Sequence, residues 1–213
     1  MDKLYAIAKD ISQKFQQADS ARERSLPMSR QAIRECSLAI RAVHRSEKET
    51  AQEHLRRAAD LLRQINETLK DNPEVMYAGF YQDAQKEFAE GNLTYALTFN
   101  EPIPTPQELS IDEAAYINGL AEAVGELRRH ALDLMRSDNF RESEKTLDKM
   151  DEIFSILTLI DFPDALTRGL RRSTDIARGC LEKTRGDLTA HHVNEHLRLD
   201  IAELQKTLKE QKL

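Results

Sequence analysis

Apolar residues recur at intervals of three and four along almost the whole chain, and this spacing restricts the fold more than any other feature. One face of an α-helix carries side chains at these intervals, whereas a half-buried strand alternates apolar and polar residues. No stretch shows that alternation between turn residues, so no strand is expected. The spacing predicts helices over residues 3–23, 28–45, 46–70, 73–99, 110–136, 139–160, 164–183 and from about 188 to the C-terminus. The predicted fold class is all-α.

The composition agrees with a single helical domain spanning residues 1–213. The chain has no Trp and only 7 Gly and 6 Pro, and it is rich in residues of high helix propensity. The predicted connections are too short to serve as a domain linker. Pro27 is predicted to restart or kink the first helix, because proline cannot donate a backbone hydrogen bond.

The sequence also predicts where the protein resides. No apolar run approaches the roughly 20 residues that cross a bilayer, and the N-terminus lacks the apolar segment of a signal peptide. Cys36 and Cys180 are the only cysteines, too few for a disulfide framework or a zinc site. We therefore expect a soluble, cytoplasmic protein with reduced thiols and no membrane partner.

Charge is unevenly distributed along the chain. The net charge is -6, but residues 71–126 contain eleven acidic residues against the single base Lys86, so this segment carries -10 and the remainder +4. An acidic centre with basic flanks implies that the centre meets cations, either metal ions or neighbouring helices.

Two pairs of carboxylates lie inside this acidic segment. Glu87 and Glu90 are three residues apart, and Glu122 and Glu126 are four apart, so each pair projects from one helical face. If the two helices pack antiparallel across the proline-rich connection, the four side chains converge. Such a cluster needs cations, and Mg²⁺ or Mn²⁺ would bind its oxygens and serve phosphodiester hydrolysis. The alternative is a solvated acidic face.

Glycines lie beside the second carboxylate pair. Gly119 and Gly125 interrupt a helix made otherwise of good helix formers, at a cost of roughly 1 kcal/mol each relative to alanine. Their presence predicts that another helix or a ligand approaches closely.

Two basic features allow more than one interpretation. On a helical wheel Arg30, Arg34, Arg41 and Arg45 share one arc, which fits either a track for nucleic-acid phosphates or a solvated face that forms ion pairs. His191, His192 and His196 offer nitrogen ligands without the glutamate of a His-Glu-x-x-His motif, so a polar or interface role is preferred over a metal site.

Four stretches of the chain together resemble the translin superfamily. They are RERSLPMSR at residues 22–30, KEFAE at 86–90, YINGL at 116–120 and GELRR at 125–129. The similarity extends over nearly the whole chain in the same helical order, and it is closer to the catalytic type, translin-associated factor X, than to translin.

The resemblance implies a bundle of about seven helices that assembles into a hollow homo-octamer with RNA inside. In the catalytic type, a Glu-aromatic-x-Glu motif and an acidic-x-x-x-Glu motif form a Mg²⁺-dependent endoribonuclease site. Glu87 and Glu90 match the first motif, and Glu126 matches the end of the second. Glu122 stands where aspartate is usual, which keeps the charge and adds one methylene.

These expectations define the candidate functions. The leading one is a Mg²⁺-dependent endoribonuclease that uses the four glutamates, with Arg129 added to the arginine line as a contact to RNA. The alternatives are a translin-type protein that binds RNA or single-stranded DNA without cleaving it, and a helical assembly scaffold.

Overall fold

The structure, a computed structural model, describes residues 1–210, and these residues contain helices and no strand. Six helices are long and three are single turns of four residues. In chain order they are α1 (Asp2–His44), α2 (Lys48–Leu69), α3 (Pro73–Met76), α4 (Gly79–Phe99), α5 (Pro106–Leu109), α6 (Glu113–Arg136), α7 (Phe140–Thr158), α8 (Asp164–Thr167) and α9 (Leu170–Glu210). The all-α prediction is confirmed.

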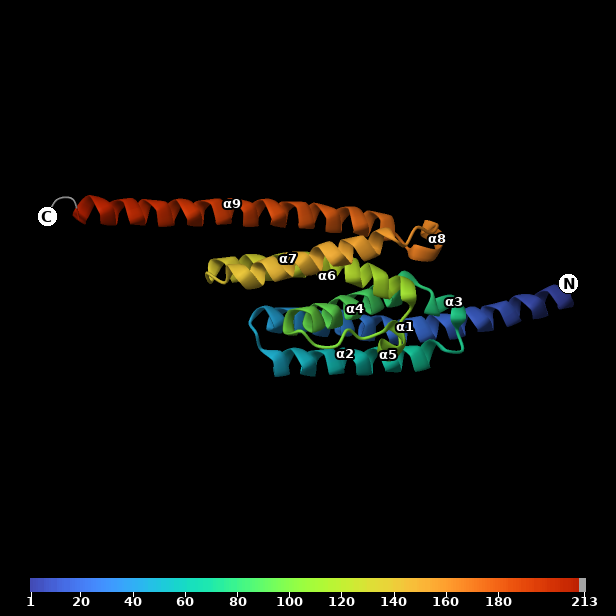
Figure 1. Ribbon diagram of the computed structural model, residues 1–213. Coiled ribbons are helices and arrows are strands. Elements are labelled where there is room, and N and C mark those ends of the chain that lie inside the picture. The colour runs from blue at the N-terminus through green and yellow to red at the C-terminus, as the bar shows by residue number, and fades with distance from the viewer. Residues whose placement is uncertain (211–213) are drawn as a thin grey trace.

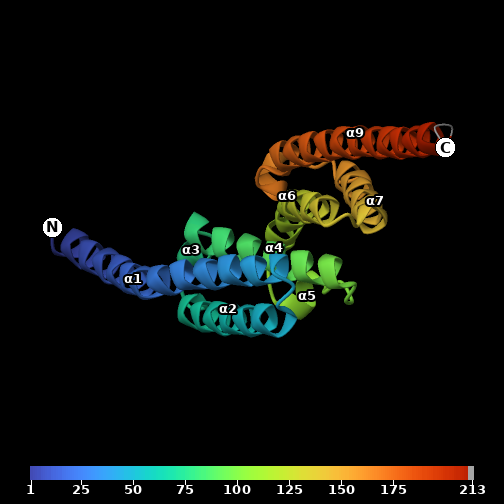
Figure 2. The ribbon, with the colours of Figure 1, turned by 90° about the vertical axis from the view of Figure 1, so that its left-hand side faces the viewer.

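The long helices form two groups that meet at one helix pair. Helices α1, α2 and α4 pack together, and α6, α7 and α9 pack together, while the contact of α4 with α6 joins the two groups (Figures 1 and 2). Figure 1 shows that α1, α4, α6 and α9 run in one direction and that α2 and α7 return. The candidate carboxylates therefore lie at the junction of the groups.

Each group has its own apolar core. The first contains Ile65, Leu69 and Phe88 among its buried residues, and the second contains Met150 and Leu157. These side chains come from the apolar faces that the sequence spacing predicts, since residues three and four apart share one side of a helix. Small residues fill the junction, where Ala89 and Ala123 lie beside Leu93.

Gly119 sets the distance between α4 and α6. A Cβ atom at this position would lie 2.6 Å from the Cβ of Ala89, 2.7 Å from the carbonyl oxygen of Lys86 and 2.8 Å from the backbone nitrogen of Glu90. Two of these neighbours are backbone atoms of α4, which cannot rotate away. Only glycine permits this approach, as the sequence predicted. A Cβ atom at Gly125, in contrast, would have no neighbouring atom within 4 Å and would face open space.

Gly119→Ala is expected to destabilise the fold because the two helices must separate. Overpacking of this kind costs about 1–3 kcal/mol, and each kcal/mol lowers Tm by about 2–4 °C in a chain of this size. Gly125→Ala on the same helix is the control, and it should leave Tm unchanged or raise it slightly through better helix propensity. Thermal unfolding followed by circular dichroism compares the two variants, and equal Tm values would contradict the assigned role of Gly119.

The predicted antiparallel packing of the two carboxylate helices is wrong, because α4 and α6 run parallel. Gly119 contacts residues 86–90 near the middle of α4, and Leu134 near the end of α6 shares a cavity with Leu97 near the end of α4. The connection at residues 100–112 makes this possible. Residues 101–105, which include Pro102 and Pro104, lie outside any helix, and the single turn α5 follows before α6 begins, so the connection is long enough to return along α4. Tyr116 donates a hydrogen bond to the carbonyl oxygen of Pro104 (2.9 Å) and holds the connection against α6.

Three helix boundaries also differ from the sequence expectations. α1 continues through Pro27. Because Pro27 is exposed, water can bond to the backbone carbonyl that proline leaves without a donor. The helix expected over 73–99 is divided into α3 and α4. The chain turns at Gly169, where φ is 88°, and α9 then continues through the expected break near 184–187 to Glu210; residues 211–213 lie outside the described part.

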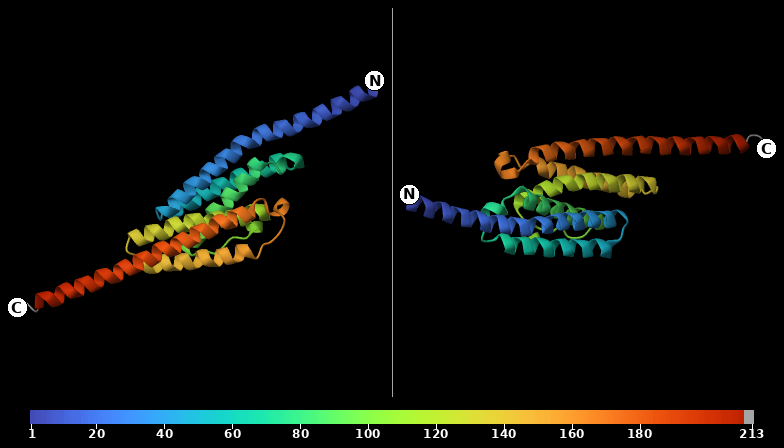
Figure 3. Two further views of the ribbon diagram at one scale, coloured as in Figure 1. Left: turned by 90° about the horizontal axis from the view of Figure 1, so that it is seen from above. Right: turned by 180° about the vertical axis from the view of Figure 1, so that it is seen from behind.

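Both ends of the described chain extend as single helices beyond the rest of the molecule, in opposite directions (Figures 1 and 3). Residues 2–17 of α1 are all exposed, including Leu4 and Phe15 at 63% and 72%. Residues 196–207 of α9 are also all exposed, including Leu197 and Leu204 at 55% and 61%. We call residues 2–17 the N-terminal arm and residues 196–207 the C-terminal arm. No helix within the described residues is long and apolar enough to cross a membrane.

Candidate metal centre

Three of the four predicted carboxylates meet between α4 and α6. Glu87, Glu90 and Glu122 each offer an oxygen, and these three oxygens all lie within 4.8 Å of one another. Glu87 and Glu90 are neighbours on α4, and Glu122 follows Gly119 by almost one turn of α6, so the close approach at Gly119 also brings Glu122 to the other two. We call these three residues the carboxylate cluster.

Glu126 lies beside the cluster but bonds elsewhere. Its Oε2 atom lies 2.5 Å from Nε2 of His44, the last residue of α1. Its charge nevertheless contributes to raising the pKa of both Glu87 and Glu90, which places it close to them. Three helices therefore position the four glutamates: α4 and α6 carry them, and α1 fixes one.

One cation of the chain enters the cluster. Lys86 donates a hydrogen bond from Nζ to Oε1 of Glu122 at 2.7 Å, and both side chains are about two-thirds covered by the protein. Burial lowers the pKa of Lys86, but the hydrogen bond and the negative charges of Glu122 and Glu87 outweigh burial and raise it overall. Lys86 is therefore charged and neutralises part of the acidic site.

Lys86 does not neutralise the charges of Glu87 and Glu90 completely. Burial, followed by the charges of Glu87 and Glu122, raises the pKa of Glu90 to about 8 from its ordinary value of 4.5. Burial and the charge of Glu122 likewise raise the pKa of Glu87. A divalent cation would reverse both effects, because it favours the ionised form of its ligands.

The chemistry of this donor set fits a hard divalent ion. All three donors are carboxylate oxygens, which Mg²⁺ and Mn²⁺ prefer, and no histidine or thiolate that would favour zinc belongs to the group. Within the described residues, no second group of three such side chains comes together in this way.

A cavity gives access to the cluster. It has a volume of about 330 Å³ and is lined by Glu87, Glu90 and Glu122 together with Ala121, Gly125, Ser173, Ile176 and Cys180. α9 supplies the far wall and is held by the buried Asn118, whose amide donates to the carbonyl oxygen of Thr167 at 2.7 Å and accepts from Ser173 at 2.8 Å. Gly125 leaves this cavity open, so one predicted glycine serves helix packing and the other serves access.

The four predicted arginines of residues 30–45 are all exposed. Arg30, Arg34 and Arg41 are exposed on α1, and no ion pair is found for them among the described residues. Arg41 precedes His44, the residue that bonds to Glu126, by three residues on α1. Arg45 instead makes two hydrogen bonds to Glu47, at 2.7 and 2.8 Å.

Arg129 lies on the other helix of the site, α6. It is exposed and follows Glu122 by seven residues, which is two helical turns on the same face. Arg30, Arg34 and Arg41 therefore lie on the helix that contacts Glu126, and Arg129 lies on the helix that carries it.

The three histidines of α9 do not form a site with further ligands. His191 and His192 both stack against Phe140, with ring centroids 5.5 and 5.6 Å apart, and Nε2 of His196 lies 3.1 Å from Nε2 of His192. No carboxylate or thiol within the described residues joins these imidazoles as a third ligand. The stacking supports the polar packing role that the sequence favoured.

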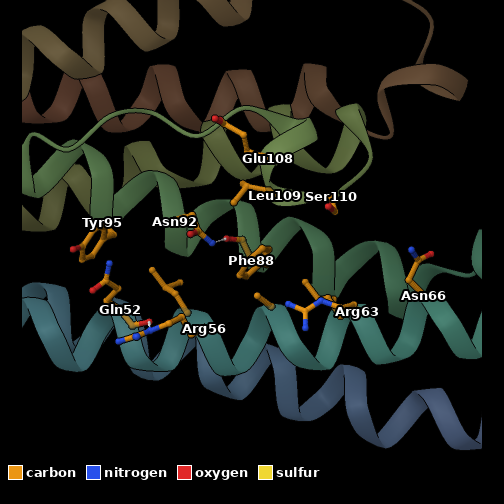
Figure 4. A pocket seen from close by; sticks show the side chains of 13 residues that line it. Gln52, Arg56, Arg63, Asn66, Phe88, Asn92, Tyr95, Glu108, Leu109 and Ser110 are labelled. Carbon is orange, nitrogen blue, oxygen red and sulfur yellow. Dashed lines mark hydrogen bonds between the residues drawn. The ribbon is translucent and has the colours of Figure 1, made fainter.

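A second, larger cavity lies on the opposite side of α4 (Figure 4). It has a volume of about 520 Å³ between α2, α4 and the α5 segment. Three of its polar side chains are already bonded within the chain: Arg63 pairs with Asp60 at 3.0 Å, Asn92 donates to the carbonyl oxygen of Phe88 at 2.8 Å, and Glu108 caps α5. This cavity offers no group of ligands or nucleophiles comparable to the carboxylate cluster.

Sequence reasoning missed the roles of His44 and Lys86. His44 lies 82 residues before Glu126, and no local pattern connects the two. Lys86 carried a usable signal, because it is the single base in an acidic segment and directly precedes Glu87.

Comparison with known proteins places this geometry in context. No family model matches the chain. The chain is 35% identical over 207 residues to the uncharacterized protein MJ0175 of Methanocaldococcus jannaschii, and the match covers 96% of this chain and 90% of the relative.

Solved structures share the fold. The structure of AfC3PO in a complex with duplex RNA superposes with a TM-score of 0.80 at 29% identity and covers 88% of this chain and 97% of that one. The crystal structure of AfC3PO gives the same TM-score of 0.80 and the same coverage. Apo-NeC3PO superposes with a TM-score of 0.77 at 17% identity, with 86% and 96% covered, and at that identity it shows the fold alone.

Proposed function

Since the chain belongs to the family of MJ0175 and has the translin/C3PO fold of the translin superfamily, we propose that it is a metal-dependent endoribonuclease. The observation that carries the proposal is the convergence of Glu87, Glu90 and Glu122 within 4.8 Å beside an accessible cavity. A protein of the same fold has been solved with duplex RNA, and we extend RNA binding to this chain.

The four glutamates have distinct roles in this proposal. Glu87, Glu90 and Glu122 hold Mg²⁺ or Mn²⁺, and the bound ion would supply Lewis acidity toward a phosphodiester and its attacking water. Glu126 keeps one oxygen on His44 and presents Oε1, which accepts the proton of the attacking water. The walls from α6 and α9 restrict bulk water around the scissile bond.

RNA is held by the exposed arginines of α1 and α6. Guanidinium groups bind phosphate oxygens through paired hydrogen bonds. Four exposed arginines are available for such contacts: Arg30, Arg34, Arg41 and Arg129. Arg45 contributes least, because RNA must displace its contact with Glu47.

We further propose that residues 1–213 form a single domain and that several copies assemble into a hollow homo-oligomer, an octamer by the resemblance to translin-type proteins. The two arms support assembly, because each presents exposed apolar side chains that a neighbouring subunit would cover. RNA bound inside such a shell explains how an acidic protein tolerates a polyanion: the arginine-lined surface faces inward.

One observation favours the alternative, a translin-type protein that binds RNA or single-stranded DNA without cleaving it. Lys86 and His44 already bond to Glu122 and Glu126, so part of the acidic charge has partners within the chain. In this alternative the ion pairs serve only to join α1, α4 and α6.

Cleavage of duplex and single-stranded RNA by the purified protein, with Mg²⁺ or with EDTA, distinguishes the two functions. We expect internal cuts that require Mg²⁺ or Mn²⁺ and that stop when the metal is removed, while RNA binding at low salt persists. Binding without cleavage at any metal concentration would favour the alternative, and the absence of binding would leave only a scaffold.

A further inference from the structure

His44 is a buried polar side chain with a single partner. Its side chain is 4% exposed, and its only hydrogen bond among the described residues joins Nε2 to Oε2 of Glu126 at 2.5 Å. Nδ1 is buried and has no hydrogen-bond partner. Buried polar side chains normally have at least one hydrogen-bond partner, and for His44 that partner is Glu126.

The pattern of contacts assigns the tautomer of His44. A proton on Nε2 is donated to the carboxylate of Glu126, and Nδ1 is then a bare acceptor. His44 therefore directs the N–H of Nε2 at Glu126.

We propose that His44 is a positioning residue that fixes the carboxylate of Glu126 beside the carboxylate cluster, an inference that rests on the proposed nuclease function. Glu122 lies four residues before Glu126 on α6, and two like charges at this spacing repel. Without the bond to His44, Glu126 would rotate away from the cluster toward solvent. The hydrogen bond from α1 holds Oε1 of Glu126 near the position of the attacking water.

A second buried His–Glu pair lies outside the site and serves as a control for the pair of His44 and Glu126. His54 of α2 bonds through Nδ1 to Oε2 of Glu35 at 2.6 Å, and both side chains are mostly buried, at 19% and 13% exposed. This pair also joins two helices, but neither residue lines the acidic cavity. A variant of His54 therefore reports the effect of losing a buried His–Glu contact without disturbing Glu126.

The experiment compares His44→Leu, His44→Gln and His54→Leu in the full-length assembled protein. His44→Leu removes the hydrogen-bond donor and should lower kcat on RNA by about 10–100-fold, with KM changed little. This is the range found when an outer-shell hydrogen-bond partner of a metal site is mutated. His44→Gln places an amide N–H near the position of Nε2 and should restore most of the activity. His54→Leu should lower Tm by a similar amount but leave kcat within twofold.

Mn²⁺ affinity measured by electron paramagnetic resonance is a second test of the role of His44, and it does not require cleavage. We expect weaker Mn²⁺ binding in His44→Leu but not in His54→Leu, because only the first displaces the charge of Glu126. Unchanged kcat and unchanged Mn²⁺ affinity in His44→Leu, or equal losses in both leucine variants, would overturn the positioning role. A wild-type protein that binds Mn²⁺ but cuts no RNA would refute the nuclease proposal instead, and the Mn²⁺ affinities would still decide the role of His44.

Discussion

Glu90→Gln is expected to abolish RNA cleavage while RNA binding persists. The amide keeps the shape of the side chain but removes a charged ligand from the group of three oxygens that meet within 4.8 Å. Loss of a metal's contribution amounts to several kcal/mol of transition-state stabilisation, and about 4 kcal/mol corresponds to roughly a thousandfold in rate. RNA affinity should change little, because in the proposed function it comes from arginine contacts to phosphates rather than from the cluster.

Glu152→Gln is the control for this experiment. Glu152 is exposed on α7, and its neutralisation changes the net charge by the same amount without touching the cavity. Cleavage rates at saturating Mg²⁺ and RNA affinities from fluorescence anisotropy should be measured for both variants. Full cleavage by Glu90→Gln would remove the cluster from the mechanism, whereas loss of binding together with cleavage would indicate misfolding.

Metal-free protein should lose stability as the pH rises from about 5 to about 8. The pKa of Glu90 is raised to about 8 in the folded protein, mainly by burial, against an ordinary value of 4.5. Between these values the folded state retains a proton that the unfolded state has released, so stability falls with rising pH. The raised pKa of Glu87 acts in the same direction.

The contribution of Glu90 can be isolated by subtraction. Burial lowers the pKa of His130, and this histidine destabilises the folded state at low pH instead. The difference in Tm between wild type and Glu90→Gln cancels that effect and should grow by several degrees from pH 5 to pH 8. Saturating Mg²⁺ at pH 8 should restore stability, since a ligand at 100 times its Kd adds about 2.7 kcal/mol. A constant difference across the pH range would contradict the proposed burial of Glu90.

The sequence predicted that four glutamates converge if their helices pack antiparallel. Glu87, Glu90 and Glu122 do meet, although the helices run parallel, whereas Glu126 bonds to His44. Spacing places the acidic residues on helical faces regardless of which way the helices run, and Gly119 marks the face that allows close approach. Orientation depends on the connection at residues 100–112, and no local pattern shows whether such a segment folds back at once or returns along the helix. The prediction of the cluster therefore survived because it required only adjacent faces.

Features that depend on distant residues could not be predicted. The contact between His44 and Glu126 joins residues 82 positions apart. The uninterrupted α9 depends on tertiary packing, because Thr184 and Leu188 are buried on either side of Gly186 and offset its low helix propensity. Arg168 and Gly169 both adopt positive φ between α8 and α9, and no local pattern shows that the chain turns at Gly169 but continues as a helix through Gly186.

The proposed assembly would couple the secondary structure of the two arms to the protein concentration. Residues 2–17 of α1 are all exposed, and an isolated helix of this length is only marginally stable in water. In a dilute subunit the arms should fray, and they should become helical when neighbouring subunits cover them. We therefore expect helix content measured by circular dichroism to rise with protein concentration, because part of the folding free energy would then belong to the assembly rather than to any one chain.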